Sequence, residues 1–311
     1  GLNWKKENFD QKRRELTNWR NHSSFDSTTY PGGLYEINKG ATNNLALFIQ
    51  DTYRPNNDWA IYTGLRIDRF KKYHGQHVTY DKVNKKYDTV NHGEGTYTEL
   101  SPRLAIEHYL NDSLNVYVSY GHSFNPPPLS QVYRYSDIVK ANPNLDPERS
   151  DSFEIGLKKE WNTKTTLNVS GFYVKTKDKI KYVTYYDRNG DVDYKMYNNV
   201  DLETRRGVEL EVRHKLSSKW SVFGNYTWQM GRIKHKELPN TNTNEYTEIN
   251  YDIPKHIFHA GLEYTSGKWN ALWDAQYVSR RQSVDDITGQ YGSEDSYFIS
   301  NVAMNYKFSK E

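Results

Sequence analysis

The sequence contains no cysteine, which excludes disulfide bonds, thiolate metal sites and cysteine nucleophiles. It also lacks any apolar run of 18 residues, so we expect no transmembrane helix. Hydrophobic residues make up 35% of the chain and the mean hydropathy is −0.97, which leaves little material for a conventional core. The net charge of +3 is too small to indicate a nucleic-acid partner, and we predict none.

Aromatic residues, in contrast, are abundant. They account for 15% of the chain, and 27 of them are tyrosines. Disordered chains are poor in aromatic and β-branched residues, so this composition favours an ordered structure. A hydrophilic average with many tyrosines is typical of a large transmembrane β-barrel, in which only alternate residues face lipid.

Side chains alternate between apolar and polar along many segments, as β-strands require. In Trp59–Phe70, one face would carry Trp59, Ile61, Leu65 and Ile67, and the other Gly64, Arg66 and Asp68. Such runs are about 9–12 residues long, which suits strands that cross a bilayer at a tilt better than the shorter strands of soluble proteins. Twelve strands are expected near Leu2–Phe9, Leu45–Arg54, Trp59–Phe70, Leu100–Tyr109, Leu114–Gly121, Phe153–Trp161, Leu167–Thr176, Gly207–Leu216, Trp220–Met230, Ile257–Tyr264, Trp269–Tyr277 and Phe298–Phe308.

The ends of these runs and the connections between them also indicate a membrane barrel. Aromatic residues that could form interfacial girdles close several apolar faces: Trp59, Tyr120, Trp161, Trp220, Trp269 and Tyr277. Tight links such as "RPNND" and "LNDS" alternate with long ones such as Ser123–Ser150. Bacterial outer-membrane barrels have short periplasmic turns and long extracellular loops, which produces this order of lengths. We therefore predict an all-β, antiparallel, up-and-down transmembrane β-barrel.

Two alternatives remain open from the pattern alone. The first is a soluble β-rich binding module or propeller, although a propeller would repeat about every 40–50 residues and no internal repeat is visible. The second is a self-contained porin-like or enzymatic barrel of about a dozen strands. Folding without detergent would support the soluble alternative, which the membrane interpretation forbids.

The sequence also resembles a known family. The segments "YGHSFNPPPL", "NPNLDPERSDSFEIGLK", "GFYVKTKDKI" and "YNNVDLETRRGVELEVRHKL" are similar to the C-terminal barrel half of TonB-dependent outer-membrane receptors of the siderophore-receptor type. The resemblance begins near Leu45 and runs to the end of the chain. Its most specific part is a box followed by spaced polar and small residues: Asn142, Pro143, Asn144, Leu145, Asp146, Pro147, Glu148, Ser152, Glu154 and Gly156.

The resemblance implies a particular domain organisation. Receptors of this family form barrels of about 22 strands that are occluded by an N-terminal plug. Residues 1–311 would then form one partial barrel domain of about 12 strands that lacks the plug, the early strands and the last strands. The start at "GLNWKKENFD" shows no signal peptide, so we expect a fragment or a removed export signal. The localisation implied is the bacterial outer membrane, with contacts to lipid and lipopolysaccharide.

The function implied by the resemblance is active import of a scarce ligand. We expect a ferric siderophore, and a TonB-type energising protein that contacts the missing N-terminal region. Haem importers of the family carry a histidine between the proline-containing strand end and the "NPNL" box, and the interval Leu129–Ala141 has none. A cobalamin or haem receptor remains the alternative within the family. We expect no enzymatic activity and no cofactor.

Candidate ligand-binding residues come from the long connections. Tyr133, Arg134 and Tyr135 combine aromatic rings with a cation, which suits an anionic aromatic iron chelate. Arg280 and Arg281 lie at the outer end of a strand, where contacts to lipopolysaccharide phosphates or solvent are the alternative. In both places an ordinary solvated loop is the simpler interpretation.

Other polar groups receive structural interpretations. His256 and His259 are three residues apart on a strand and point to opposite faces, and His74, His77 and His92 share one long connection, so we predict no metal site. Charged residues on the polar faces could suggest acid–base chemistry. We interpret them instead as lumen residues that pair across strands and, in the intact receptor, hold the plug: Arg66, Asp68, Arg103, Glu107, Glu154, Glu209, Glu211 and Arg213.

Overall fold

The computed structural model is dominated by one large antiparallel β-sheet. It describes residues 1–18, 20–136, 138–241, 246–250, 252–284 and 291–308. The strands of the large sheet are β1 (Leu2–Arg14), β2 (Leu34–Asn56), β3 (Trp59–Asp81), β4 (Lys86–Asn91), β5 (Gly95–Asn111), β6 (Leu114–Asn125), β7 (Glu148–Trp161), β8 (Thr165–Tyr186), β9 (Val192–Lys215), β10 (Trp220–His235), β11 (Tyr246–Asn250), β12 (His256–Ser266), β13 (Trp269–Val278) and β16 (Tyr297–Tyr306). A separate hairpin pairs β14 (Arg281–Val284) with β15 (Tyr291–Glu294).

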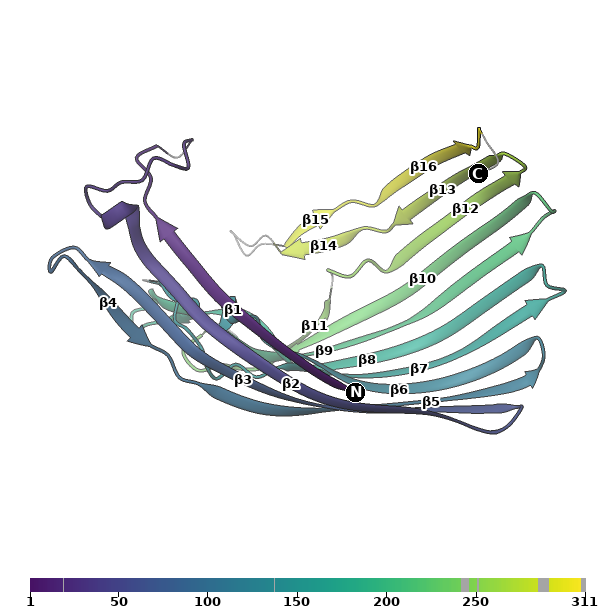
Figure 1. The fold of residues 1–311 in the computed structure, drawn as a ribbon, viewed down its shortest axis with the longest axis horizontal. Coiled ribbons are helices and arrows are strands. Elements are labelled where there is room, and N and C mark those ends of the chain that lie inside the picture. Colours follow the sequence, from purple (N-terminus) through teal and green to yellow (C-terminus); the bar gives the residue numbers. More distant parts are fainter. Residues whose placement is uncertain (19, 137, 242–245, 251, 285–290, 309–311) are drawn as a thin grey trace.

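Successive long strands pair with their neighbours in chain order, from β1 to β16, so the sheet is an up-and-down meander. All twelve strands expected from the alternation are present in this path, with β4 and β11 attached as short side strands on β3 and β10. Figure 1 shows the sheet curved into an open trough. In the described part of the chain β1 pairs only with β2 and β16 only with β13, so the sheet is not closed.

The two ends of the strands differ. At one end, here called the turn end, short turns join β2 to β3, β5 to β6, β7 to β8, β9 to β10 and β12 to β13. At the other, the loop end, the connections are long (Figure 1). The long connections expected there are partly stranded, because many of their residues extend the strands. β3 continues to Asp81 and returns as β4, and β8 and β9 form a hairpin that reaches Tyr186 and Val192.

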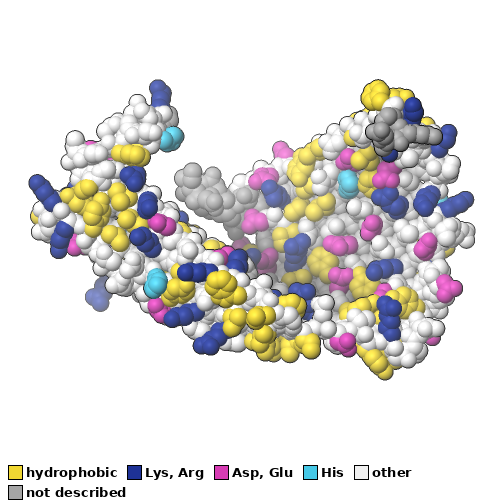
Figure 2. Space-filling model, viewed as in Figure 1, with side chains coloured by type: hydrophobic (Ala, Val, Ile, Leu, Met, Phe, Trp, Pro, Cys, Tyr) yellow, Lys and Arg dark blue, Asp and Glu magenta, His cyan; other side chains and the backbone are white. Residues whose placement is uncertain are grey.

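The sheet has an apolar outer face and a polar inner face. On the outer face Leu210 is 38% exposed and Ile49 is 71% exposed, although both are strongly hydrophobic. On the inner, concave face Asp68 is only 1% exposed. Figure 2 shows Lys and Arg side chains interspersed with Asp and Glu, without a large block of one sign. Burial of polar groups and exposure of apolar ones is the reverse of a soluble domain, and it suits a sheet whose outer face contacts lipid.

Helical structure is confined to two short elements, η1 (Pro31–Gly33) and α1 (Leu129–Val132). No helix among the described residues is long and apolar enough to cross a membrane. α1 belongs to the connection between β6 and β7, residues 126–147, here called the inward loop. Its contacts with β1 and β2 show that the loop crosses the concave side of the sheet.

Candidate functional site

The inward loop carries its own small apolar core. Leu129, Val132, Tyr133 and Leu145 are buried, and Phe9 of β1, Ile180 of β8 and Tyr197 of β9 pack against them. Lys72 of β3, which shares a face with Asp68, donates a hydrogen bond from Nζ to the Leu145 carbonyl at 2.6 Å. The loop therefore joins strands from distant parts of the trough across its concave face.

Tyr133 lies at the centre of this core and is fully buried. Two glycines make room for its ring: a Cβ added at Gly40 of β2 or at Gly75 of β3 would come within 2.2 Å of a ring carbon. Burial raises the pKa of the Tyr133 hydroxyl to about 12. Tyr133 thus has no free surface to offer a ligand in this structure, and its contacts are those of a packing residue.

The box Asn142–Glu148 fastens the inward loop to the β8–β9 hairpin. Asn142 donates from Nδ2 to the Tyr197 carbonyl at 2.8 Å and also accepts from the Asn144 backbone amide. Leu145 and Pro147 are fully buried. At the end of the box, Glu148 Oε1 accepts the backbone N–H of Ile180 at 2.9 Å. Pro143 lies near Gly93, in the connection between β4 and β5. A Cβ added to Gly93 would lie 3.8 Å from the Pro143 ring. These contacts give the motif a structural role.

Glu154 and Gly156, which follow the box on β7, have a common partner on β6. The Tyr117 hydroxyl donates to Glu154 Oε1, and the Tyr117 ring lies over Gly156, where an added Cβ would meet ring carbons at 2.5–2.6 Å. The cross-strand register places Tyr117 opposite Gly156, so the glycine leaves room for the ring to lie flat against the inner face. Glu154 and Gly156 are two residues apart because one binds the Tyr117 hydroxyl and the other accommodates the Tyr117 ring.

Arg134 and Tyr135 follow Tyr133 in the inward loop and are half-buried. Tyr135 lies beside His77 of β3, with ring centroids 4.3 Å apart, and its carbonyl accepts a hydrogen bond from Asn38 at 3.2 Å. Asn38 in turn contacts His77 Nδ1 at 2.8 Å and donates to Glu36 Oε1 at 2.8 Å. Tyr135 is therefore held by a buried polar network on β2 and β3, whereas Arg134 Nε is buried without a hydrogen-bond partner among the described residues.

A second set of side chains faces Arg134 from the β8–β9 hairpin. Tyr182 and Tyr197 are cross-strand partners whose ring centroids lie 4.8 Å apart. Burial raises the pKa of the Tyr182 hydroxyl, while the positive charges of Arg134 and of Arg13 on β1 act on it in the opposite direction. Both cations therefore act electrostatically on this phenol, and Arg13 is itself paired with Glu36 at 3.1 Å. We call Arg13, Arg134, Tyr182, Tyr197 and Lys195, whose Nζ is 5.9 Å from the Tyr182 ring centroid, the tyrosine–cation cluster.

The sequence predicted only one member of this cluster, Arg134. The missed residues lie in "KIKYVTYY" and "YKMYNN", where tyrosines and lysines alternate at both sides of a turn. Because this alternation leaves no apolar face, it could have indicated a solvated hairpin that extends beyond the apolar belt of the sheet. It could not show that Arg134 of the inward loop faces this hairpin. Arg13 lies far away in the sequence, on β1, where it pairs with Glu36 of β2.

Arg280 and Arg281 are placed elsewhere: Arg280 lies in the connection from β13 to β14, and Arg281 is the first residue of β14. Arg280 Nε donates to Ser293 Oγ at 2.6 Å and Arg281 Nε to Glu294 Oε2 at 2.5 Å. Both arginines are engaged by the neighbouring strand, and none of the contacts described for them involves the inward loop. The structure does not bring them together with Arg134.

The histidines and lumen charges are held by local contacts. His77 and His92 flank Tyr135, and burial lowers the pKa of His92. No group of three or more metal-ligating side chains occurs within the described ranges. His259 of β12 contacts Asp274 of β13 at 3.4 Å.

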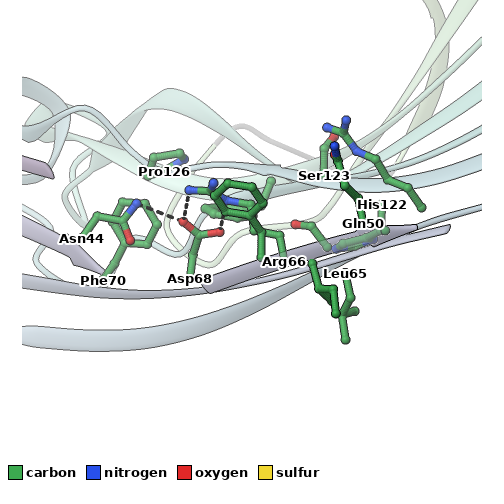
Figure 3. A pocket seen from close by; sticks show the side chains of 15 residues that line it. Asn44, Gln50, Leu65, Arg66, Asp68, Phe70, His122, Ser123 and Pro126 are labelled. Carbon is green, nitrogen blue, oxygen red and sulfur yellow. Dashed lines mark hydrogen bonds and ion pairs between the residues drawn. The ribbon is translucent and has the colours of Figure 1, made fainter. Parts of the chain in front are cut away.

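A hollow of about 440 Å³ opens on the concave face beneath the start of the inward loop. Figure 3 shows Arg66, Asp68 and Asn44 gathered there, with Leu65 directed away from them. Arg66 makes two hydrogen bonds to the Asp68 carboxylate, at 2.6 and 2.7 Å, and Asn44 donates a third at 3.0 Å. Asp68 is thus fully engaged, as expected of a residue that organises a polar lining rather than of a general base.

Comparison with known proteins agrees with this architecture. A family model described as "TonB dependent receptor-like, beta-barrel" matches residues 2–311. The chain is 22% identical to the catecholate siderophore receptor Fiu of Escherichia coli K12, over 92% of this chain and 39% of that protein. A crystal structure of Fiu in its closed form superposes with a TM-score of 0.70 at 18% identity, over 99% of this chain and 45% of that one. The siderophore receptor PiuA of Acinetobacter baumannii gives a TM-score of 0.70 at 17% identity, over 99% and 46%. The chain therefore spans about two fifths of the curated relative's length.

Proposed function

Since the chain belongs to the TonB-dependent receptor-like β-barrel family, a family of transport receptors, we propose that it forms part of a receptor that imports a ferric siderophore. Residues 1–311 would supply a partial barrel domain, and a TonB-type protein would supply energy through a region outside this chain. Receptors of the family are outer-membrane proteins of Gram-negative bacteria, so the turn end would face the periplasm and the loop end the exterior.

The observation that supports a siderophore is the tyrosine–cation cluster at the loop end. Ferric catecholates carry negative charge and planar aromatic rings. Arginine and lysine stabilise such a ligand by charge-assisted hydrogen bonds, and tyrosine rings offer stacking surfaces. Arg134 suits this task because its side chain is half-buried and its Nε has no hydrogen-bond partner among the described residues, so a ligand that bound the guanidinium would break no hydrogen bond at Nε. The name of the relative Fiu agrees with a catecholate.

The position of the cluster also fits import. Arg134 sits on the inward loop, Arg13 on β1, and the tyrosines on β8 and β9, so a ligand held by all of them would contact both sides of the trough at once. Arg280 and Arg281 remain proposed as outer contacts that meet the ligand earlier. Tyr135, whose ring is flanked by His77 and His92, remains proposed as a further ligand contact.

The test is ligand binding to the full-length receptor in detergent, together with uptake of radioactive iron by cells. Replacing Arg134 by alanine should weaken ferric-catecholate binding by about 10- to 100-fold, because one or two charge-assisted hydrogen bonds are lost. Lys164→Ala is the matched control, since Lys164 lies in the β7–β8 turn at the opposite end. Equal binding by Arg134→Ala and wild type, or preferential binding of haem or cobalamin in the same assay, would refute the proposal.

A further inference from the structure

Two imidazole rings lie against the Tyr135 ring of the inward loop. The ring centroid of His77, on β3, is 4.3 Å from that of Tyr135, and the ring centroid of His92, in the connection between β4 and β5, is 5.8 Å from it. The His92 ring is also stacked on Tyr133, with centroids 6.3 Å apart. The loop segment that contains Arg134 is therefore held on β3 and on the β4–β5 connection by contacts between tyrosine and histidine.

His77 is fixed by a buried polar network. Its side chain is 3% exposed, and its Nδ1 lies 2.8 Å from Asn38 Oδ1. Asn38 Nδ2 donates to Glu36 Oε1 at 2.8 Å and to the Tyr135 carbonyl at 3.2 Å, and Glu36 is paired with Arg13. An amide oxygen can only accept, so Nδ1 of His77 donates in this arrangement. The position and tautomer of this ring therefore follow from its neighbours on β2.

His92 has no comparable support for a charged ring. Its backbone N–H donates to the Gly75 carbonyl at 2.8 Å, but its Nε2 is buried without a hydrogen-bond partner among the described residues. A neutral imidazole can leave one nitrogen unprotonated, whereas an imidazolium carries an N–H on both. Protonation of His92 in place would therefore bury a donor that has no acceptor, which costs free energy. Burial lowers the pKa of His92, in agreement with this geometry.

The charges around His92 do not offset this cost. The titratable and charged side chains on the elements around it are Tyr133, Arg134, Tyr135 and Asp146 of the inward loop, Lys71, Lys72, His74 and His77 of β3, and Glu94 of its own connection. Of the two carboxylates, Glu94 is paired with Lys71 at 3.2 Å, and Asp146 acts electrostatically on Lys72. Within the described part of the chain, burial is the cause of the lowered pKa of His92, and none of these charges contributes to it.

From this geometry we propose that His92 is a positioning residue that makes docking of the inward loop sensitive to acid. The uncharged ring packs against Tyr133 and Tyr135 and keeps the segment between them on the concave side. When His92 gains a proton, the charged ring leaves this place for water, and the loop loses the contact. The contribution of neutral His92 to docking is complete above its ordinary pKa of 6.5 and is lost as the pH falls below that value, since the undocked ring binds the proton first.

The consequence for ligand binding rests on the proposed function, because it requires that Arg134 contacts the cargo. If the loop undocks in acid, Arg134 moves away from Tyr182 and Tyr197, and the tyrosine–cation cluster is no longer complete. Docking of the loop itself can be measured without any ligand. A failure of the acid response and a failure of the proposed ligand site are therefore distinguishable.

The first measurement is hydrogen exchange of the full-length receptor in detergent at about pH 7.5 and about pH 5.0, corrected for the intrinsic exchange rate. Three loop amides report docking because each donates to a backbone carbonyl: those of Tyr133, Lys140 and Asn142. In wild type their protection factors should fall by about fivefold or more in acid, as a buried donor without an acceptor requires. The upper limit is about thirtyfold, because pH 5.0 is about 1.5 units below the ordinary pKa of 6.5.

Two variants and one control test the assignment to His92. His92→Phe keeps a ring that cannot be protonated, and His92→Gln removes the charge with a smaller polar side chain, so in both the fall between the two pH values should disappear. His108→Phe is the control, because His108 stacks on Trp59 at the turn end, with ring centroids 4.1 Å apart, and this variant should keep the wild-type response. Unchanged protection of wild type in acid, or the wild-type fall in both His92 variants, would overturn the proposal.

The second measurement is the affinity for a ferric catecholate at the same two pH values. The catecholate itself takes up protons in acid, so the informative quantity is the loss of affinity in wild type relative to that in His92→Phe. We expect wild type to lose more, by about the factor seen in the protection of the loop. Equal losses together with a fall in wild-type protection would confirm the acid-sensitive loop and contradict the proposed contact between Arg134 and the ligand.

Discussion

The turn end and the loop end of this sheet differ in how strictly they constrain the identity of their residues. At the turn end the strands need only place apolar side chains outward and polar ones inward, as Leu210 and Glu211 do, and many sequences could satisfy that pattern. At the loop end the inward loop depends on individual contacts, such as the Tyr133 ring between Gly40 and Gly75. The turn end should therefore tolerate substitution within a residue class, whereas the loop end requires particular residues.

The largest expected effect falls on the loop end. Replacing Tyr133 by alanine removes a fully buried ring from the loop core and should destabilise the docked loop by about 3–5 kcal/mol. Hydrogen exchange in residues 129–145 should then become fast while exchange in the turn-end halves of the strands stays unchanged. Tyr53→Ala is the control, because Tyr53 is 61% exposed on the outer face. Unchanged exchange in Tyr133→Ala would mean that the loop end does not depend on this individual side chain more than the turn end does.

The second prediction concerns the turn end. Leu210→Arg places a charge on the lipid face and should cost about 2–4 kcal/mol near the middle of the membrane. Glu211→Arg, one residue further on the inner face, should cost far less, although it loses the hydrogen bond from Asn168 to Glu211 at 3.1 Å. The measurement is reversible folding of the full-length receptor into lipid vesicles. Equal costs for the two substitutions would show that the faces are assigned wrongly.

This contrast explains what could be predicted from the sequence. The alternation in Trp59–Phe70 is visible because lipid on one side and water on the other demand different residues every second position. The pattern fades above the membrane, where both faces are polar, and so the predicted end of β8 at Thr176 falls short of the observed end at Tyr186. The alternation therefore reveals the part of each strand that has one apolar face, and it gives no signal for the part beyond it, where both faces are polar.

The candidate site was harder to predict because it depends on contacts between distant segments. "VYRYS" indicates a ring-and-cation loop, but nothing local distinguishes the buried Tyr133 from the half-exposed Arg134 and Tyr135. That distinction follows from two glycines on β2 and β3, which are separated from the loop by several strands. The family motif near Asn142 was recognised as a pattern, whereas its function as a fastener for the β8–β9 hairpin required the fold.

A change of pH provides a third and smaller perturbation of the loop end. Burial raises the Tyr133 pKa from 10.0 to about 12, so the docked loop favours the neutral phenol. Its contribution to stability is complete below pH 10 and is lost as the pH rises through 12, since the undocked tyrosine ionises first. At pH 11 the loss is about 1.4 kcal/mol for a difference of two pKa units between the states. The protection factors of the loop amides, which are corrected for the base-catalysed intrinsic exchange rate, should fall by about tenfold at that pH in wild type but not in Tyr133→Phe. An equal fall in both proteins would assign the change to another group.

The smallest predicted effect tests whether the loop-end rule extends to single members of the family box. Asn142 donates to the Tyr197 carbonyl and to Asn198 Oδ1, whereas Asn144, two residues later, is exposed and contributes its backbone amide. Asn142→Ala should therefore weaken docking of the inward loop by about 1 kcal/mol, and Asn144→Ala by less than about 0.5 kcal/mol. Both can be measured by hydrogen exchange of residues 194–200, which the box covers. Equal effects would mean that the box acts through its backbone shape alone, and the loop end would then resemble the turn end in its tolerance of side-chain identity.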